Sequence, residues 1–206
     1  MSPHEITSTH QRQGLTALQV ILLFSFLILG GVGIVSSTAQ APPKEEREFE
    51  DKIPKHLPIK VTVKYPEKVK NLQNENWVQD LELAVENKSD KPIYYLGLMV
   101  ILDDVKTEDN YKLGFPLQYG RGDLIDWSVP LQPDDVPIKP GETYTFKIPV
   151  NLQQGWERHA ARHGLSKAVP KKVRLKFQSL NFGDGTGFGT VEGVPVDIHA
   201  KSAANS

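Results

Sequence analysis

The glycine-rich stretch at residues 181–189, NFGDGTGFG, is the local sequence that most resembles a ligand-binding loop. Such loops bind phosphate when a helix follows and offers the N–H groups of its first turn. The next residues, TVEGVP, cannot start a helix, so the sequence disfavours a nucleotide site. We expect a tight hairpin or Ω-like loop turned by Asp184 and Gly185, with Phe182 and Phe188 as its anchors. A calcium loop built on Asp184 and backbone carbonyls is the alternative.

Carboxylates also gather in three other predicted loops, at 103–109, 123–126 and 134–135. Calcium prefers six to eight oxygen ligands, which loops at one end of a domain can supply together. None of these segments has the spacing of an EF-hand, and acidic loops are usually solvated. We therefore predict no metal site and no cofactor, and we keep as weak calcium candidates Asp184, Asp103 and Asp104.

Two histidines, His159 and His163, are four residues apart and would share one face of a helix. Paired imidazoles at this spacing can bind zinc, but no glutamate follows the first histidine as in the HExxH motif. Arg158 and Arg162 would also place like charge beside a metal ion. We expect a basic, solvated helix face, which could equally contact anionic lipid or an acidic patch on a partner protein.

Trp127 lies in the middle of a long connection, residues 120–141, which also contains the tripeptide Arg-Gly-Asp at 121–123. A tripeptide recurs often by chance, so we expect a plain turn there and not an adhesion motif. Trp127 is predicted to pin the long loop to the core. The alternative is an exposed platform for a sugar or peptide, in which case Trp127, Asp184 and Phe188 would form one binding surface.

Composition excludes several classes of function. The chain has no cysteine, so disulfides, thiolate zinc sites and cysteine nucleophiles are excluded. Its formal net charge of −1 gives no electrostatic footprint for nucleic acid. No serine, histidine and acid can be assembled into a nucleophilic relay from their spacing. We therefore do not predict an enzyme.

The uncharged apolar run at residues 15–35, behind a leader at 1–14, predicts a single membrane-spanning helix. About 20 residues at roughly 1.5 Å each match a hydrocarbon core of roughly 30 Å. The alternative is a signal peptide cleaved after Ala41, because AQA at 39–41 resembles a cleavage site. More positive charges follow the run than precede it, which argues weakly against export. We nevertheless expect a single-pass membrane protein whose C-terminal domain is extracytoplasmic, either periplasmic or extracellular.

Beyond this run, residues 36–56 are small, proline-containing and charged, and are predicted to form a flexible linker. Strict alternation begins at 59–65 and returns at 173–182. Together with a more fully apolar run at 93–102 and with turn signals, it predicts seven strands, at 59–65, 78–86, 93–102, 112–119, 144–150, 173–182 and 194–198. A short helix is expected over 152–164, with Trp156 and Ala160 as its packing face. The fold class is thus all-β, an antiparallel sandwich of about seven strands over 57–199, with a disordered tail at 200–206.

Two turn sequences, ENKSDKPI at 86–93 and IKPGE at 138–142, resemble strand introductions common in bacterial exported immunoglobulin-like domains. The resemblance covers roughly residues 57–199 and implies an immunoglobulin-like fold in a cell envelope, although the Cys…Trp…Cys core of antibody domains is missing. We expect a non-enzymatic binding or structural module with a protein partner in the envelope. The alternative is a calcium or carbohydrate module using the loops at 103–110, 120–141 and 181–189, and an enzyme comes third.

Overall fold

The computed structural model describes residues 45–203, so the predicted leader at 1–14 and the apolar run at 15–35 lie outside the described residues. Among the residues that are described, no helix is both long and apolar enough to cross a bilayer.

Residues 45–203 are mainly β-structure, as the all-β prediction requires. The strands are β1 (Glu48–Asp51), β2 (Ile59–Val63), β3 (Glu82–Asn87), β4 (Tyr95–Lys106), β5 (Lys112–Tyr119), β6 (Thr143–Lys147), β7 (Lys172–Asn181), β8 (Thr186–Gly189) and β9 (Val194–Asp197). The helices are α1 (Pro66–Lys70), α2 (Trp77–Asp80), α3 (Val150–Arg162) and α4 (Ile198–Ala203), with a 3₁₀ turn η1 (Gly122–Ile125).

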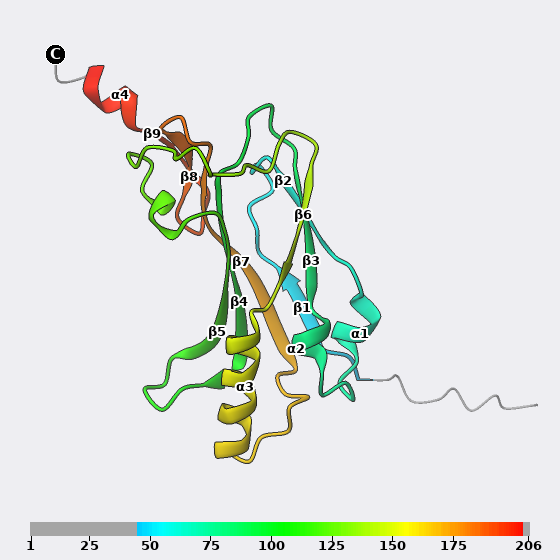
Figure 1. The fold of residues 1–206 in the computed structure, drawn as a ribbon. Helices are drawn as coiled ribbons and strands as arrows, with labels where there is room; N and C mark the ends of the chain where they lie inside the picture. The colour runs from blue at the N-terminus through cyan, green and yellow to red at the C-terminus, as the bar shows by residue number, and fades with distance from the viewer. Residues whose placement is uncertain (1–44, 204–206) are drawn as a thin grey trace, which may run out of the picture. The chain divides into compact units, whose positions relative to one another are not determined.

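The strands form two sheets that lie face to face (Figure 1). The larger sheet has the order β5-β4-β7-β8-β9, and β1 pairs in parallel with the first half of β7. The smaller sheet has the order β2-β3-β6, and every pairing other than β1 with β7 is antiparallel.

Alternation of apolar and polar residues places one face of each sheet in a common core. In β3 the buried positions alternate through Leu83 and Val85, and in β7 through Val173, Leu175 and Phe177. These residues belong to one continuous hydrophobic cluster that includes side chains from both sheets. The packing of both inner faces into one core makes the domain a two-layer β structure.

The predicted linker is wrong for its second half, because residues 46–53 are built into the domain. β1 adds to the edge of β7, and Arg47 is buried, with 1% of its surface exposed. Its guanidinium donates to the backbone carbonyls of Val69, Ala168 and Pro170, and it stacks over the ring of Trp77 at 4.5 Å. Charge density predicted a solvated segment, whereas backbone carbonyls solvate this cation inside the protein.

The predicted strand at 78–86 is also wrong at its beginning. Residues 77–80 form the single-turn helix α2, and β3 starts only at Glu82. Trp77, Val78 and Leu81 are all buried, and their i, i+1, i+4 spacing suits one face of a helical turn and not a strand. Conversely, the glycine-rich stretch contains a strand, β8, that was not predicted.

Candidate functional site

A pocket of about 330 Å³ lies between helix α3 and strand β5, an edge strand of the larger sheet. Strand β5 contributes Leu113, Gly114 and Phe115 to its wall. Helix α3 contributes Leu152, Gly155, Trp156, Arg158, His159 and Arg162. Figure 1 shows α3 beside β5 at the end of the sandwich that also carries the β4–β5 turn.

The spacing along α3 explains how these residues come together. Leu152, Gly155, Trp156 and His159 recur at i, i+3, i+4 and i+7, so they lie on one face of the helix. Trp156 is 2% exposed and joins the core, as does Ala160, which confirms the predicted packing face. A Cβ added at Gly155 would meet no atom within 4 Å other than those of its chain neighbours and the backbone of its own helix, so this glycine leaves open space on the same face.

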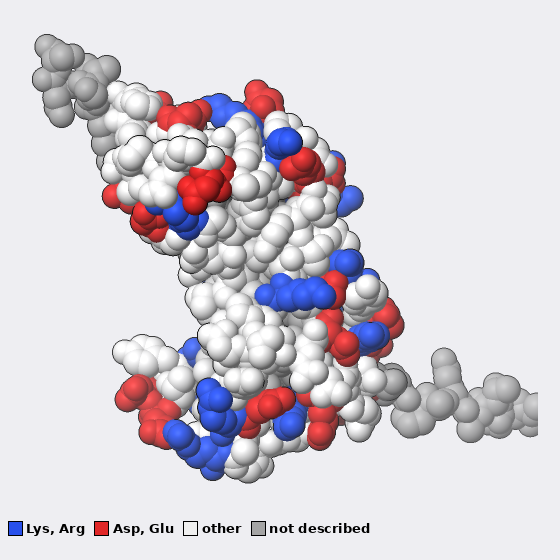
Figure 2. Space-filling model, viewed as in Figure 1, with Lys and Arg blue, Asp and Glu red and all other residues white. Residues whose placement is uncertain are grey.

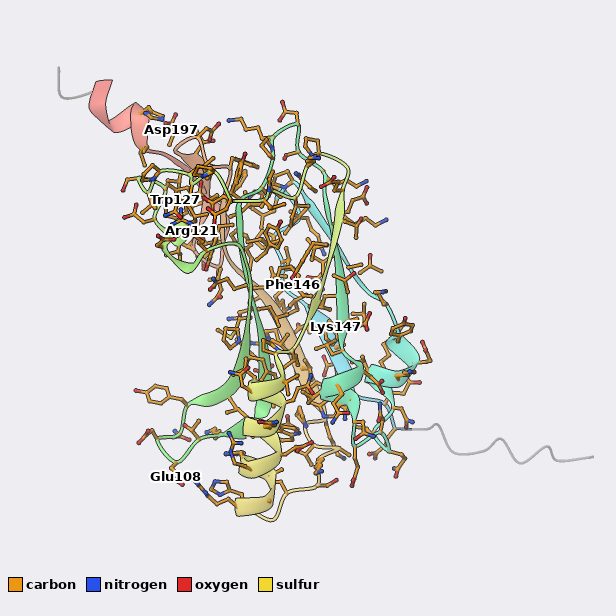
Figure 3. The ribbon with its side chains drawn as sticks, viewed as in Figure 1. Glu108, Arg121, Trp127, Phe146, Lys147 and Asp197 are labelled. Carbon is orange, nitrogen blue, oxygen red and sulfur yellow. The ribbon has the colours of Figure 1, made fainter. Side chains whose placement is uncertain are left out.

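The pocket is lined by basic residues, and two of its lining residues carry buried ring nitrogens without partners. Trp156 Nε1 and His159 Nε2 are buried and form no hydrogen bond within the described residues. Burial lowers the pKa of His159 below its usual value, and the neighbouring His163 and Arg162 act in the same direction. His159 is therefore largely neutral at pH 7. Figure 2 shows blue side chains beside red ones at this end of the molecule, and Glu108 lies next to α3 in Figure 3.

The pocket lining combines one histidine with apolar and basic side chains. It includes no serine, threonine, cysteine, aspartate or glutamate, so His159 has no nucleophile or orienting acid among the described residues of the pocket wall. Apolar walls from both elements, together with a few convergent donors, are typical of sites for small ligands. The histidine pair predicted as a solvated face is thus only partly solvated, because His159 is half-buried.

Trp127 packs as the pin that the sequence predicts. Its Nε1 donates to the carbonyl of Leu180 at 3.0 Å, and its ring covers Gly187 and Gly189 of β8. A Cβ at Gly187 would lie 2.5 Å from Trp127 Nε1 and 2.1 Å from the Leu180 carbonyl oxygen, so only glycine fits there. Figure 3 shows Trp127 inside the long loop over β8 and β9.

Trp127, Asp184 and Phe188 do not form one exposed surface. Residues alternate across β8, and Gly187 and Gly189 face Trp127, so Phe188 points to the opposite side. There its ring packs edge-on against Phe182 at 6.2 Å, as predicted for the anchors of the loop. The structure therefore does not support an aromatic platform of Trp127 and Phe188.

The Asp184 side chain stabilises the glycine-rich turn and forms an ion pair. Gly185 has a φ of +81°, which confirms the predicted positive-φ turn. The Asp184 carboxylate accepts hydrogen bonds from Lys91 Nζ at 2.8 Å and from the Thr186 amide at 3.0 Å. Burial opposes its ionisation, but the hydrogen bonds from Lys91 and Thr186 outweigh that effect and lower the pKa of Asp184.

Asp103 and Asp104 are far from Asp184. Tyr95 pairs with Asn181 beside the glycine-rich turn, and Asp103 follows eight residues later along β4, about 26 Å away at roughly 3.3 Å per residue. Asp103 forms ion pairs with Lys112 and Arg174, and Asp104 accepts from the Lys171 amide at 2.8 Å.

Both residues thus lie at the opposite end of the sandwich, and strand β4 extends to Lys106, through the first part of the segment predicted as their loop. Within residues 45–203, no group of three or more His, Cys, Asp or Glu side chains is placed to hold a metal ion.

The charged side chains of the Arg-Gly-Asp tripeptide form hydrogen bonds within the loop that contains them. Arg121 donates to both carboxylate oxygens of Asp135, at 2.8 and 3.1 Å, and to Asp123 at 2.7 Å. These hydrogen bonds lower the pKa of Asp135, with the Arg121 contact as the largest cause. Arg121 therefore stabilises the folded conformation of the long loop by linking two of its segments.

Comparison of the chain with protein-family models, curated proteins and solved structures finds no match. The candidate site therefore rests on geometry. Sequence reasoning found the helix and its basic residues but missed Leu113, Gly114 and Phe115, because strand alternation carries no signal for which helix will pack on that strand.

Proposed function

We propose that the described residues form an immunoglobulin-like module that binds a small ligand or ligand group in the pocket between α3 and β5. The main support is the lining of the pocket, which combines apolar walls and basic groups and, among the described residues, includes no nucleophile or acid. Binding without chemical conversion is the function that this lining supports best.

The immunoglobulin-like assignment is supported by strand order. Immunoglobulin-like sandwiches place strands A, B and E together in one sheet and C, F and G in the other, with C′ beside C where it is present. The order β2-β3-β6 corresponds to A-B-E, and β5-β4-β7-β8 corresponds to C′-C-F-G. Helix α3 then occupies the connection between E and F, which places the pocket on an inserted element of the common sandwich.

The cellular setting is proposed from the apolar run at 15–35, which suits a membrane anchor that exports the domain. A reporter enzyme that is active only outside the cytoplasm, fused after Ser206, should be active in cells. Deletion of residues 15–35 should abolish this activity while the fusion still accumulates. An inactive full-length fusion would contradict the export proposal. It would not affect the pocket proposal, which has a separate test.

The pocket proposal is tested with two substitutions at one position. Leucine at Gly155 projects into open space on the pocket face, so Gly155→Leu should fill the pocket without disturbing the helix. Gly155→Ala is the matched control, because one methyl group leaves most of the volume free. Isothermal titration calorimetry on the full chain in a non-ionic detergent would use matched small carboxylates, amides and amines as probes. Binding of any probe class that is lost in Gly155→Leu and kept in Gly155→Ala supports the proposal, and absence of pocket-dependent binding by every class refutes it.

A further inference from the structure

We infer that the pocket between α3 and β5 binds a carboxylate carried on a small apolar group, as in the last residue of a peptide or a free branched-chain carboxylic acid. This inference rests on the proposed function and names the ligand chemistry of the same site. Four features of the pocket support it.

The first feature is charge. Arg158 and Arg162 both line the pocket, and no acidic side chain does among the described residues. The ion pair of Arg162 with Glu108 is 3.7 Å long, and both side chains are more than 70% exposed, so solvent screens it. A guanidinium binds a carboxylate through two parallel hydrogen bonds, which a primary amide or an ammonium group cannot reproduce. The two arginines therefore select for an anion.

The second feature is a backbone donor on the edge of the sheet. Pro116 has no N–H, and proline is tolerated in an edge strand where the nitrogen faces away from the neighbouring strand. Because backbone groups alternate with a period of two, the N–H of Gly114 faces the same open side as the Pro116 nitrogen. Gly114 lines the same pocket as the two arginines, so its N–H is an uncharged donor on that edge.

The third feature is a pair of buried ring nitrogens. Trp156 is only 2% exposed, and its Nε1 has no hydrogen-bond partner among the described residues. His159 Nε2 is also buried and without a partner, while the His159 side chain as a whole is half-buried, and the two rings stack with centroids 6.1 Å apart. Both residues line the pocket, and their ring nitrogens, which solvent does not reach, would need a small shift of the rings to pair with a bound ligand.

The fourth feature is the apolar wall of the pocket, which concerns the part of the ligand that carries the carboxylate. Leu113, Phe115 and Leu152 supply apolar wall around a cavity of about 330 Å³. This volume is at the lower end of the range for small-ligand pockets, so it suits one small apolar group. Inorganic phosphate has no apolar part and would leave these walls uncovered.

The experiment is calorimetric titration of the full chain in a non-ionic detergent. The probes are 4-methylpentanoate, its primary amide, the matching amine and inorganic phosphate. Acetyl-Gly-Leu with a free or an amidated C-terminus separates a peptide source from a free acid. The variants are Arg158→Gln, Arg162→Gln, Gly155→Leu and Gly155→Ala, and Lys139→Gln removes one exposed positive charge elsewhere as the matched control.

We expect each free acid to bind at least tenfold more tightly than its amide. Each arginine variant should weaken acid binding at least fivefold, Gly155→Leu should abolish it, and Lys139→Gln should leave it unchanged. Tighter binding of the free dipeptide than of 4-methylpentanoate would identify a peptide C-terminus as the source, and the reverse would identify a free acid.

Three results would overturn the inference. Equal affinity for acid and amide, phosphate binding as tight as that of the acids, or acid binding insensitive to both arginine variants would each exclude this ligand class. If the amide or the amine binds and Gly155→Leu abolishes that binding, the ligand class is wrong while the proposed pocket function stands. If no probe binds the pocket, both proposals fail.

Discussion

Replacing Arg47 with methionine tests whether the segment before β2 belongs to the fold. The guanidinium of Arg47 serves three backbone carbonyls, of Val69, Ala168 and Pro170, and covers the ring of Trp77. These partners come from α1 and from the loop before β7, so one side chain joins the segment before β2 to two other parts of the chain. Burial lowers the pKa of Arg47 to about 10, which still leaves it charged at neutral pH.

The expected loss of stability follows from the backbone carbonyls that lose the guanidinium as their hydrogen-bond donor. Methionine fills a similar volume but donates nothing, so three carbonyls lose their donor. A buried polar group without a partner costs about 1–3 kcal/mol, and loss of a cation–π contact adds about 1 kcal/mol. Relief from burying the guanidinium offsets part of this sum. We therefore expect Arg47→Met to lower the free energy of unfolding by about 3 kcal/mol, a large share of the 5–15 kcal/mol typical of a domain.

Urea unfolding of the full chain in a non-ionic detergent, followed by tryptophan fluorescence, measures this loss. Lys55→Met is the control, because its side chain is 82% exposed and lies in the same segment, and we expect a change within about 0.5 kcal/mol. Arg47→Lys should recover little, since one ammonium group cannot serve three carbonyls in a fixed fork geometry. A loss below about 1 kcal/mol in Arg47→Met would refute this account of the buried arginine.

Other predictions concern the turn and the helix. Gly185→Val should destabilise the domain by more than about 1 kcal/mol in urea unfolding, because φ is +81° and a Cβ there would lie 2.6 Å from His199 Nε2. Asp184→Asn should change stability by less than about 1 kcal/mol, since asparagine keeps the turn and loses only an exposed ion pair; a calcium-dependent rise in melting temperature, present in wild type and absent in this variant, would instead restore the calcium loop. Trp156→Ala should cost about 3–5 kcal/mol by loss of a buried indole, and a value near zero would contradict the packing of α3. The lowered pKa of His159 means that the folded state binds its proton less readily than the unfolded state, so stability should fall as pH drops below about 6.5. His159→Gln should flatten the melting temperature between pH 7 and pH 5, and an unchanged pH profile would contradict this contribution.

The sequence by itself determined the features that depend on local pattern. Period-two alternation located β2 and β7, because a half-buried strand must place its apolar residues on one side. Turn chemistry located the Asp184–Gly185 turn, since positive φ is accessible to glycine without strain. The packing face of α3 followed from the spacing of Trp156 and Ala160 for the same local reason.

Tertiary structure alone decided which segments meet. Arg47 reads as part of a charged linker, and its burial depends on carbonyls from Val69 and from two residues more than 100 positions away. Phe188 and Trp127 are separated by the two faces of β8, which depends on the unpredicted strand and on its pairing with β7. The pocket needs α3 to lie against β5, and the apolar faces of both elements would accept many partners. Hydrophobic burial is non-directional, so a sequence pattern specifies which side of an element is covered and leaves the covering element to the whole fold.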